Sequence, residues 1–356
     1  MIYLNARFTG QSLTGVQRVA YELGRRLVER RNDVKAVAPV QPDADYAIPV
    51  QIAPAAAPQA GGHFWEQVTL PRMIGKRDLL VGLGATGPVS LERQIVMIHD
   101  VNYLLGADGY SWKFRTWYRF LHRFLTARAS ICTVSHWSAK EIAKAYSIPV
   151  EQITVIHNAA DHLDDVTSKP GTLAHFGINA RPYALCVGSS NPNKNFQTAL
   201  AAYQSLENPG FDLVIVGAGN ARIFRDETGG QGAHPSIHRL PRMDDSELKA
   251  VFEGAGVFLM PSILEGFGLP ALEAMKLGVP VVSSNAASLP EVCGDAALYC
   301  DPLDVSGMAS ALERVMGDHC FAEELSAKGG SRAASFSWDA SAAKLNALID
   351  RRLSEG

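Results

Sequence analysis

The sequence lacks any apolar run that could cross a membrane. No uninterrupted stretch approaches the roughly 18 to 20 apolar residues that a bilayer requires. Residues 1–10 include Arg7 and several polar side chains, where a secretory signal would need apolar ones. We therefore expect a cytoplasmic protein without a transmembrane segment.

Cysteine is scarce as well, and net charge is small. The spacing of the five cysteines matches neither paired zinc ligands nor a disulfide framework, so we expect reduced, structural thiols at Cys132, Cys186, Cys293, Cys300 and Cys320. A net charge of −3 argues against a general nucleic-acid binder. The apolar content of 47% is typical of a soluble globular protein, and 356 residues suffice for about two domains.

Short apolar segments alternate with helical patterns in both halves of the chain. Strands are predicted at 2–5, 34–40, 78–83, 95–99, 131–135, 153–158, 183–187, 212–216, 237–240, 257–260 and 279–282. Helices are predicted at 15–30, 136–146, 195–206, 246–254, from about 269, and at 337–353. Residues 41–62, rich in Pro and Ala, are predicted to be irregular.

This alternation predicts an α/β protein with two doubly wound, Rossmann-like domains that face a shared cleft. The first domain is expected at 1–165 and the second at 182–336. The polar segment 166–181 is expected to link them, and the final helix, within 337–356, to pack back across this linker.

The stretch LEGFGLPALEAMKLGVPVV, residues 264–282, places a glycine turn between an apolar strand and a helix. Pro270 suits the first turn of that helix, so Glu265 precedes the turn and Glu273 projects from the helix start. Loops at the carboxyl ends of parallel strands bind ligands, and free N–H groups at a helix start attract phosphate. Carboxylates accept hydrogen bonds from sugar hydroxyls, although most surface glutamates only cap helices or contact solvent.

A second strand-to-helix loop, CVGSSNPNKNF, places Lys194 near a helix start. A solvent-exposed lysine is the simpler interpretation, but its charge is unfavourable against the helix dipole, which favours a role in phosphate binding. In the first half, Gly10 and Gly15 frame a glycine-containing loop, and His99 and Asp100 end a strand. A lone histidine is usually structural.

The stretch 82–87 fits the dinucleotide pattern G-x-G-x-x-G but lacks its context. Pro88 and Val89 follow where a helix should open, and no acidic residue stands at the end of the next strand. We therefore do not expect a dinucleotide cofactor there.

Together these motifs resemble the GT-B-fold retaining glycosyltransferases of family four, in particular the mannosyltransferases of bacterial polysaccharide synthesis. The resemblance rests on TGVQRV, IHD, TVSHWSAKEI, VIHNAAD, VGSSNPNKN, LEGFGLPALEA, GVPVVSSNAASLPEVCGDAALY and FSW, in that order along nearly the whole chain. The E-x7-E spacing is met by Glu265 and Glu273. The resemblance implies an acceptor-side domain at 1–165 and a nucleotide-sugar-binding domain at 182–336.

The resemblance also implies residue roles. Glu265 would lie against the donor sugar, Glu273 would hold ribose hydroxyls, and Lys194 would bind the diphosphate. His99 would contact the transferred sugar, which makes His99, Glu265 and Lys194 the expected catalytic residues. The donor-binding set would comprise Gly15, Ser189, Asn193, Lys194, Leu240, Met243, Glu265, Gly266, Phe267, Gly268, Leu269 and Glu273.

One position departs from the family. Many relatives carry Arg-Lys-Asn where this chain has Asn193-Lys194-Asn195, so Arg239 or Arg242 could supply the missing cation. The family is metal-independent and no Asp-x-Asp occurs in a suitable loop, so we expect neither a metal nor another cofactor.

The implied reaction moves a hexose, with GDP-mannose or a related sugar favoured, to a glycan or lipid-linked acceptor in cell-surface polysaccharide synthesis. Two alternatives share the fold: a nucleotide-sugar epimerase or hydrolase, and a catalytically idle partner that binds nucleotide sugar. The presence of His99, Lys194, Glu265 and Glu273 argues against the idle partner.

Residues 110–128, YSWKFRTWYRFLHRFLTAR, form a basic, aromatic helical pattern with two interpretations. In the first, Phe114, Trp117, Leu121, Phe124 and Leu125 pack as a core face while the arginines are solvated. In the second, the remaining aromatic residues and the row Arg115, Arg119 and Arg123 rest on an anionic membrane, which would make the protein peripheral on the inner face of the cell membrane.

Overall fold

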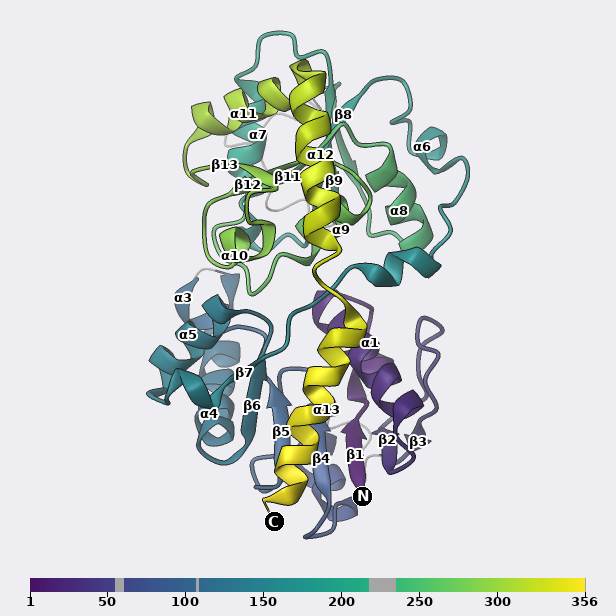
Figure 1. The fold of residues 1–356 in the computed structure, drawn as a ribbon, viewed down its shortest axis with the longest axis vertical. Helices are drawn as coiled ribbons and strands as arrows, with labels where there is room; N and C mark the ends of the chain where they lie inside the picture. Colours follow the sequence, from purple (N-terminus) through teal and green to yellow (C-terminus); the bar gives the residue numbers. More distant parts are fainter. Residues whose placement is uncertain (55–60, 107–108, 218–234, 356) are drawn as a thin grey trace. The chain divides into compact units, whose positions relative to one another are not determined.

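The computed structural model describes residues 1–54, 61–106, 109–217 and 235–355. These residues form two compact units, each built around its own parallel sheet (Figure 1). The first unit comprises Met1–Asn158 and Ser337–Gly356, and the second comprises Ala159–Phe336. The predicted α/β class with two doubly wound domains is confirmed.

In the first unit, seven described strands lie in the order β3-β2-β1-β4-β5-β6-β7, and all neighbouring pairs are parallel. Their bounds are β1 Ile2–Asn5, β2 Val34–Ala38, β3 Gln51–Ile52, β4 Leu79–Gly82, β5 Gln94–Met97, β6 Ser130–Thr133 and β7 Thr154–Val155. β4 and β5 are buried along their whole length, as expected for central parallel strands covered on both faces.

The helices of the first unit cover both faces of this sheet. They are η1 Arg7–Gly10, α1 Gly15–Arg30, α2 Gly61–Phe64, the π-helix η3 Trp65–Thr69, η4 Leu70–Met73, α3 Asn102–Leu105, α4 Trp112–Arg128, α5 His136–Tyr146, η6 Val150–Gln152 and α13 Trp338–Ser354. Helices α1 and α5 have the bounds predicted from the sequence. α1 buries Val19, Leu23 and Leu27 on one stripe.

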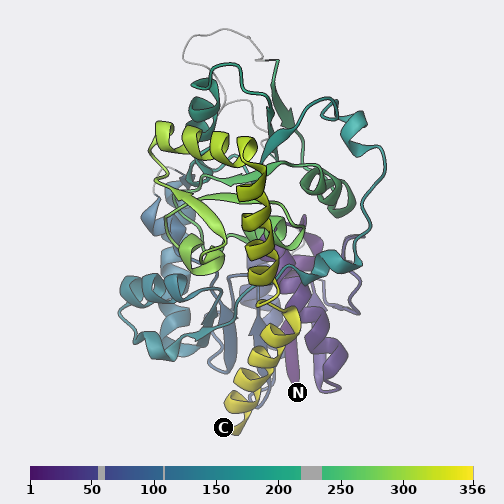
Figure 2. The same cartoon turned by 45° about the horizontal axis from the view of Figure 1, so that its top comes forward.

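In the second unit, six described strands lie in the order β10-β9-β8-β11-β12-β13, again all parallel. Their bounds are β8 Tyr183–Val187, β9 Asp212–Val216, β10 Ile237–Leu240, β11 Val257–Met260, β12 Val281–Ser284 and β13 Ala297–Cys300. The helices are η7 Asp161–Asp165, α6 Thr172–His175, η8 Pro192–Lys194, α7 Phe196–Gln204, α8 Asp245–Glu253, α9 Leu269–Lys276, α10 Leu289–Cys293, α11 Val305–Gly317 and α12 His319–Ala333. α12 packs along α9 and lies in front of the sheet in both views (Figures 1 and 2).

The chain divides between the units at other points than the sequence suggested. Residues 166–181, predicted to be the linker, lie within the second unit, where Lys249 Nζ donates to the Val166 carbonyl oxygen at 2.7 Å. Lys169 of the same segment also bonds to α8, since its Nζ donates to Glu247 Oε1 at 2.7 Å. The helix predicted to cross the linker, α13, belongs to the first unit and is tied to α1 by Arg26 and Asp339, 2.8 Å apart. The predicted irregular stretch 41–62 includes β3 and the start of α2, while its residues 55–60 lie outside the described part.

The predicted core face of α4 is buried only in the second half of the helix. Leu121 and Leu125 are buried as expected, His122 is buried beside them, and Phe114 and Trp117 are each 37% exposed. Phe114 shares a helix face with Leu121 and Leu125, so its exposure reflects its place in the first turn and not a different face. None of the described helices is both long and apolar enough to span a membrane.

Candidate functional site

The second sheet reverses its strand order between β8 and β11. The chain leaves the carboxyl ends of these two neighbouring strands toward opposite sides of the sheet. Ligands of doubly wound proteins bind at such a switch point. The two loops that the sequence singled out, 188–195 after β8 and 261–268 after β11, both start there.

Hydrogen bonds hold these two loops together. Asn195 adopts a left-handed conformation with φ of 55° at the start of α7. Its side-chain amide donates to the carbonyl oxygens of Pro261, at 2.9 Å, and Pro302, at 2.6 Å. The backbone N–H of Ile263 donates to the Asn193 carbonyl oxygen at 2.9 Å. The loop that carries Lys194 therefore has a fixed position beside the loop that carries Glu265.

Lys194 and Glu265 form a direct ion pair. Lys194 Nζ lies 2.6 Å from Glu265 Oε1, although the residues are 71 positions apart in the chain. Ser262 Oγ donates to the same carboxylate oxygen at 2.8 Å, and Ser288 Oγ donates to the Glu265 carbonyl oxygen at 2.9 Å. Glu265 is only 9% exposed. The pair places one cation and one hydroxyl-binding carboxylate side by side at the switch point.

Gly268 shapes the start of α9. Its φ is +100°, and a Cβ atom built there would lie 2.5 Å from the Leu289 side chain, so only glycine fits. Pro270 occupies the first turn, as the sequence predicted. Helix α9 therefore begins directly after Glu265, Gly266 and Phe267, with the free N–H groups of its first turn at the same edge of the sheet.

Glu273 has a partner that the sequence did not reveal. His162 Nε2 lies 3.4 Å from Glu273 Oε1, and the His162 side chain is 4% exposed against 12% for Glu273. His162 directly follows the motif VIHNAAD, but the sequence suggested no role for it within the expected first domain, 1–165. The signal that the sequence offered for His162 was its place directly after a motif that begins in a predicted strand.

The other predicted donor residues of this unit lie in or next to the loops after β8, β10 and β11. Ser189 is exposed in the loop after β8, and Gly266, Phe267 and Leu269 are buried at the start of α9. Leu240 ends β10 and Met243 follows it, and β9 separates this strand from β8. Arg239 and Arg242, the proposed substitute cations, are exposed on the same edge of the sheet.

Two further predicted residues, His99 and Gly15, belong to the first unit. His99 follows β5 and its Nε2 donates to the Leu83 carbonyl oxygen at 2.9 Å, which leaves Nδ1 as an acceptor. Burial lowers the pKa of His99 to about 4, against a smaller opposing effect of the bond to Leu83. The imidazole is therefore neutral near pH 7 and can accept a hydrogen bond from a hydroxyl group. Gly15 opens α1.

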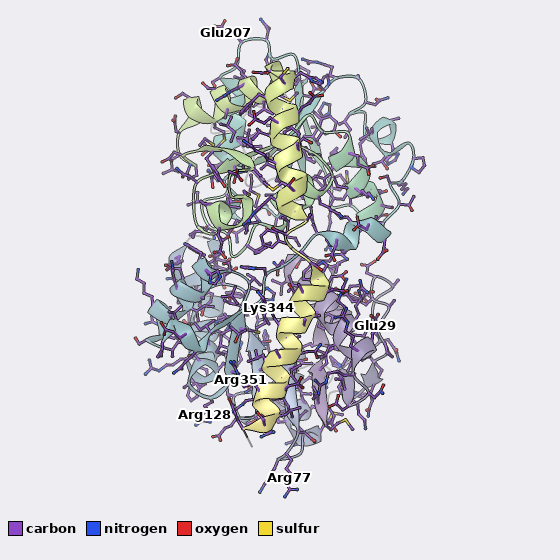
Figure 3. The ribbon with its side chains drawn as sticks, viewed as in Figure 1. Glu29, Arg77, Arg128, Glu207, Lys344 and Arg351 are labelled. Atoms are coloured by element: carbon purple, nitrogen blue, oxygen red, sulfur yellow. The ribbon has the colours of Figure 1, made fainter. Side chains whose placement is uncertain are left out.

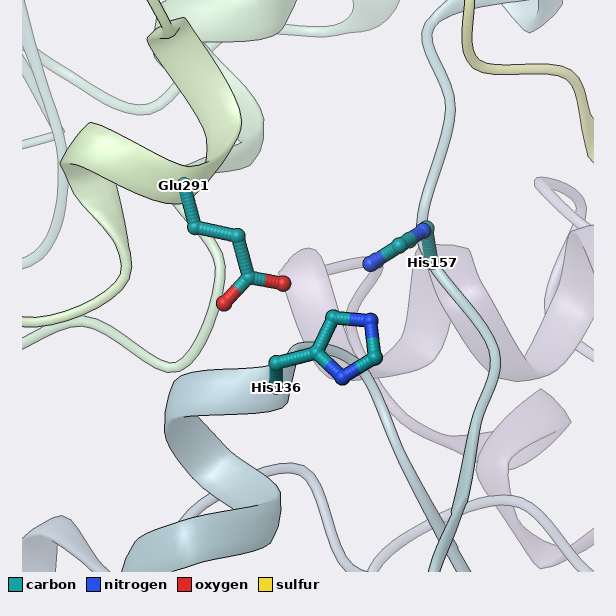
Figure 4. A group of neighbouring side chains, drawn as sticks. All are labelled: His136, His157 and Glu291. Carbon is teal, nitrogen blue, oxygen red and sulfur yellow. The ribbon is translucent and has the colours of Figure 1, made fainter.

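Two histidines of the first unit lie side by side outside the predicted site. The ring centroids of His136, at the start of α5, and His157, after β7, are 5.6 Å apart at an interplanar angle of 69° (Figure 4). Glu291, also drawn there, belongs to the second unit. Two imidazoles are fewer than the three protein ligands of a catalytic zinc site, so this pair alone does not make a metal centre.

Comparison with known proteins accounts for both units. The family model described as Glycosyltransferase Family 4 matches residues 13–162, and the one described as Glycosyl transferases group 1 matches residues 172–335. O-antigen chain mannosyltransferase B of Escherichia coli is 34% identical over 266 residues, which cover 71% of this chain and 68% of that protein. O-antigen chain mannosyltransferase RfbU of Salmonella typhimurium is 27% identical over 71% of this chain and 69% of its own.

Solved structures share the fold at low sequence identity. Sucrose-phosphate synthase from Thermosynechococcus elongatus matches with a TM-score of 0.74 and 18% identity, over 100% of this chain and 99% of that one. HepE from Anabaena, in complex with UDP and glucose, matches with a TM-score of 0.75 and 16% identity, over 98% of each chain. Taken with the two family models and the 34% identical relative, these matches show that the chain belongs to the family 4 glycosyltransferases and has the GT-B fold.

Proposed function

We propose that this glycosyltransferase moves mannose from GDP-mannose to a hydroxyl group of a glycan or lipid-linked acceptor, with retention at the anomeric carbon. The ion pair of Lys194 and Glu265 at the switch point carries the proposal, because it joins a phosphate-binding cation to a hydroxyl-binding carboxylate. The choice of mannose is supported by two relatives, both of which are named O-antigen chain mannosyltransferases. A role in cell-surface polysaccharide synthesis follows from the same relatives.

In this proposal, different residues of the second unit bind different parts of the donor. The donor diphosphate binds Lys194 and the start of α9, and these groups stabilise its negative charge as the bond from sugar to phosphate breaks. Once a phosphate takes over Lys194, the Glu265 carboxylate is released to accept hydrogen bonds from hexose hydroxyls. Glu273, positioned by His162, holds the ribose hydroxyls.

Lysine and backbone N–H groups supply the positive charge in this scheme, so the reaction proceeds without a divalent cation. We expect saturating EDTA to leave the transfer rate unchanged. A rate that falls with EDTA and recovers with Mg²⁺ or Mn²⁺ would contradict this part of the proposal.

Incubation of the purified protein with GDP-mannose or UDP-glucose, with and without a glycan acceptor, tests the reaction class. Transfer requires the acceptor, whereas an epimerase or hydrolase consumes the donor alone and an idle partner consumes nothing. Proton NMR of the product should show an α linkage from the α-linked donor. Turnover with UDP-glucose but not with GDP-mannose, or an inverted linkage, would overturn the proposal.

We also propose that the enzyme works at the cytoplasmic face of the cell membrane through α4. The aromatic residues Trp112, Phe114 and Phe120 are exposed, with exposed fractions of 70%, 37% and 49%. Lys113, Arg119, Arg123 and Arg128 are exposed beside them, and 110–128 contains no acidic residue. Aromatic rings and cations on one helix fit an anionic bilayer surface, where each basic residue contributes about 1 kcal/mol.

Vesicle co-sedimentation tests this surface. Arg115 is left out of the test because its Nε donates to the Tyr103 carbonyl oxygen at 3.1 Å. The double variant Arg119→Gln/Arg123→Gln should bind anionic vesicles roughly 30-fold more weakly than wild type. The control Lys344→Gln/Arg351→Gln removes two charges from α13, where both side chains are exposed (Figure 3). Equal loss in both variants, or no binding by wild type, would contradict membrane docking through α4.

A further inference from the structure

The first unit has a switch point of its own, and a buried carboxylate lies at it. The strand order reverses between β1 and β4. Glu66, from the π-helix η3, reaches Asn5 at the end of β1 and Thr86 in the loop after β4. This edge of a doubly wound sheet binds ligands in other proteins.

One oxygen of this carboxylate accepts two hydrogen bonds. Glu66 Oε1 accepts from Asn5 Nδ2 at 2.6 Å and from Thr86 Oγ1 at 2.8 Å. Arg7 Nε lies 3.6 Å from the same oxygen, and Arg7 Nη2 donates to Thr86 Oγ1 at 2.9 Å. The loops after β1 and β4 are thus joined around Glu66.

The other oxygen has no such partner. Among the described residues, Glu66 Oε2 and His63 Nδ1, which lie 3.7 Å apart, each make no hydrogen bond. Glu66 is 0% exposed, and an unpaired buried acceptor destabilises a fold. Burial raises the pKa of the Glu66 carboxyl, but the contacts with His63, Arg7, Thr86 and Asn5 together lower it by more. The pKa therefore lies below its ordinary value, and the carboxylate is a charged acceptor.

The local backbone is unusual as well. Residues Trp65–Thr69 form a π-helix, a rare element that frequently occurs at functional sites. Trp65 fixes it in the core, since its ring is fully buried and its Nε1 donates to the Ala53 carbonyl oxygen at 2.6 Å. The buried Trp65 therefore fixes the position of the neighbouring Glu66 at the sheet edge.

The outer side of the cluster is open and aromatic. The His63 side chain is 41% exposed, and its ring centroid lies 5.9 Å from that of Trp117, which is 37% exposed. An exposed aromatic face can pack against the apolar C–H face of a pyranose, while a carboxylate and an imidazole bind its hydroxyls. Because His63 Nδ1 makes no hydrogen bond to a described residue, a ring rotation that opens Glu66 Oε2 breaks none at that atom.

We propose that Arg7, His63, Glu66, Thr86 and Trp117, the Glu66 cluster, bind the terminal sugar of the glycan acceptor. Glu66 Oε2 accepts from one sugar hydroxyl, His63 bonds a second, and Trp117 covers the ring. This inference rests on the proposed glycosyl transfer and identifies where that reaction takes its acceptor.

Acceptor kinetics with a water-soluble mannose oligosaccharide test the cluster without the membrane. Glu66→Gln keeps the size of the side chain and removes its charge, and should raise the acceptor KM about 10- to 100-fold. The donor KM and the hydrolysis of donor without acceptor should stay at wild-type values. The matched control Glu29→Gln makes the same change on α1, where the side chain is 59% exposed (Figure 3), and should alter nothing.

Two further variants keep the test decisive if Glu66→Gln fails to fold. His63→Ala and Trp117→Ala change partly exposed side chains, and each should raise the acceptor KM several-fold. An unchanged acceptor KM in both would overturn the inference. If wild type transfers no sugar at all, the proposed function fails, and calorimetric binding of mannotriose then decides the inference: binding that weakens in His63→Ala and Trp117→Ala supports it, and no binding overturns it.

Discussion

Replacing Lys194 with methionine removes the charge at the switch point while keeping most of the side-chain volume. The change affects donor binding in two ways. It deletes the cation that would contact the diphosphate, and among the described residues it leaves the Glu265 carboxylate, 9% exposed, with Ser262 as its remaining side-chain donor. An incoming diphosphate would then meet an uncompensated negative charge where it had met an ion pair.

The size of the effect follows from the geometry. A lysine about 4 Å from a phosphate charge is worth roughly 4 kcal/mol at an effective dielectric constant near 20. If desolvation cancels half of this, about 2 kcal/mol remains, or roughly a 30-fold loss of affinity for GDP. Loss of one preorganised donor to the leaving group lowers kcat/KM for transfer by about 10² to 10³.

A double-mutant cycle separates the two effects. Glu265→Gln added to Lys194→Met removes the repulsion, so we expect the double variant to bind GDP more tightly than Lys194→Met alone, without recovering transfer. Titration calorimetry with GDP and a radiolabelled transfer assay measure the two quantities. Lys276→Met is the control, because Lys276 forms another ion pair of this unit, 2.8 Å from Asp164. Transfer by Lys194→Met within a few-fold of wild type, or a double variant that binds GDP more weakly than the single one, would refute the reasoning.

Three other outcomes are expected. Glu273→Ala should lower kcat/KM about 10²-fold, and His162→Asn should raise the donor KM about 10-fold with less effect on kcat, because the histidine only positions the carboxylate; equal donor KM values for His162→Asn and wild type would exclude that role. Burial lowers the pKa of both His99 and His122 to about 4, below the ordinary value of 6.5, so the unfolded chain takes up more protons between these values. The contribution of the two neutral histidines to stability is complete above about pH 6.5. It is lost as the pH falls toward 4, at about 1.4 kcal/mol per pH unit for each histidine. Urea denaturation at pH 7, 6 and 5 measures this loss, and a free energy of unfolding that does not fall with pH counts against the prediction. Gly268→Ala, at a φ of +100° and with a Cβ atom 2.5 Å from a leucine side chain, should cost about 1 to 3 kcal/mol of stability and weaken GDP binding; an unchanged melting temperature would show that the turn can relax.

Several elements of the second unit were not predicted from the sequence. No element was predicted between 283 and 336, where the structure has β13, α10, α11 and α12. Adjacent Gly329 and Gly330 weaken the helical pattern of α12, since glycine is a poor helix former. In the structure, a Cβ atom at position 329 would lie 3.2 Å from the Met275 side chain, so glycine lets α12 approach α9 closely. A packing requirement thus overrode local propensity.

The sequence by itself determined the features that depend on near neighbours. Alternating apolar segments predicted two parallel sheets, and Pro270 with the glycine turn before it located the start of α9. Lys194 was found because it lies in one strand, loop and helix unit, and Glu265 and Glu273 because they lie in another.

Tertiary structure decided which of these units meet. Lys194 pairs with Glu265 because β8 and β11 are neighbours at the switch point, and Glu66 reaches Asn5 because η3 packs beside β1. Packing also assigned α13 to the first unit and left the first turns of α4 exposed. Local patterns fix the direction of a strand or the face of a helix, but the burial of apolar surface over the whole domain selects neighbouring strands, and no short stretch of sequence contains that information.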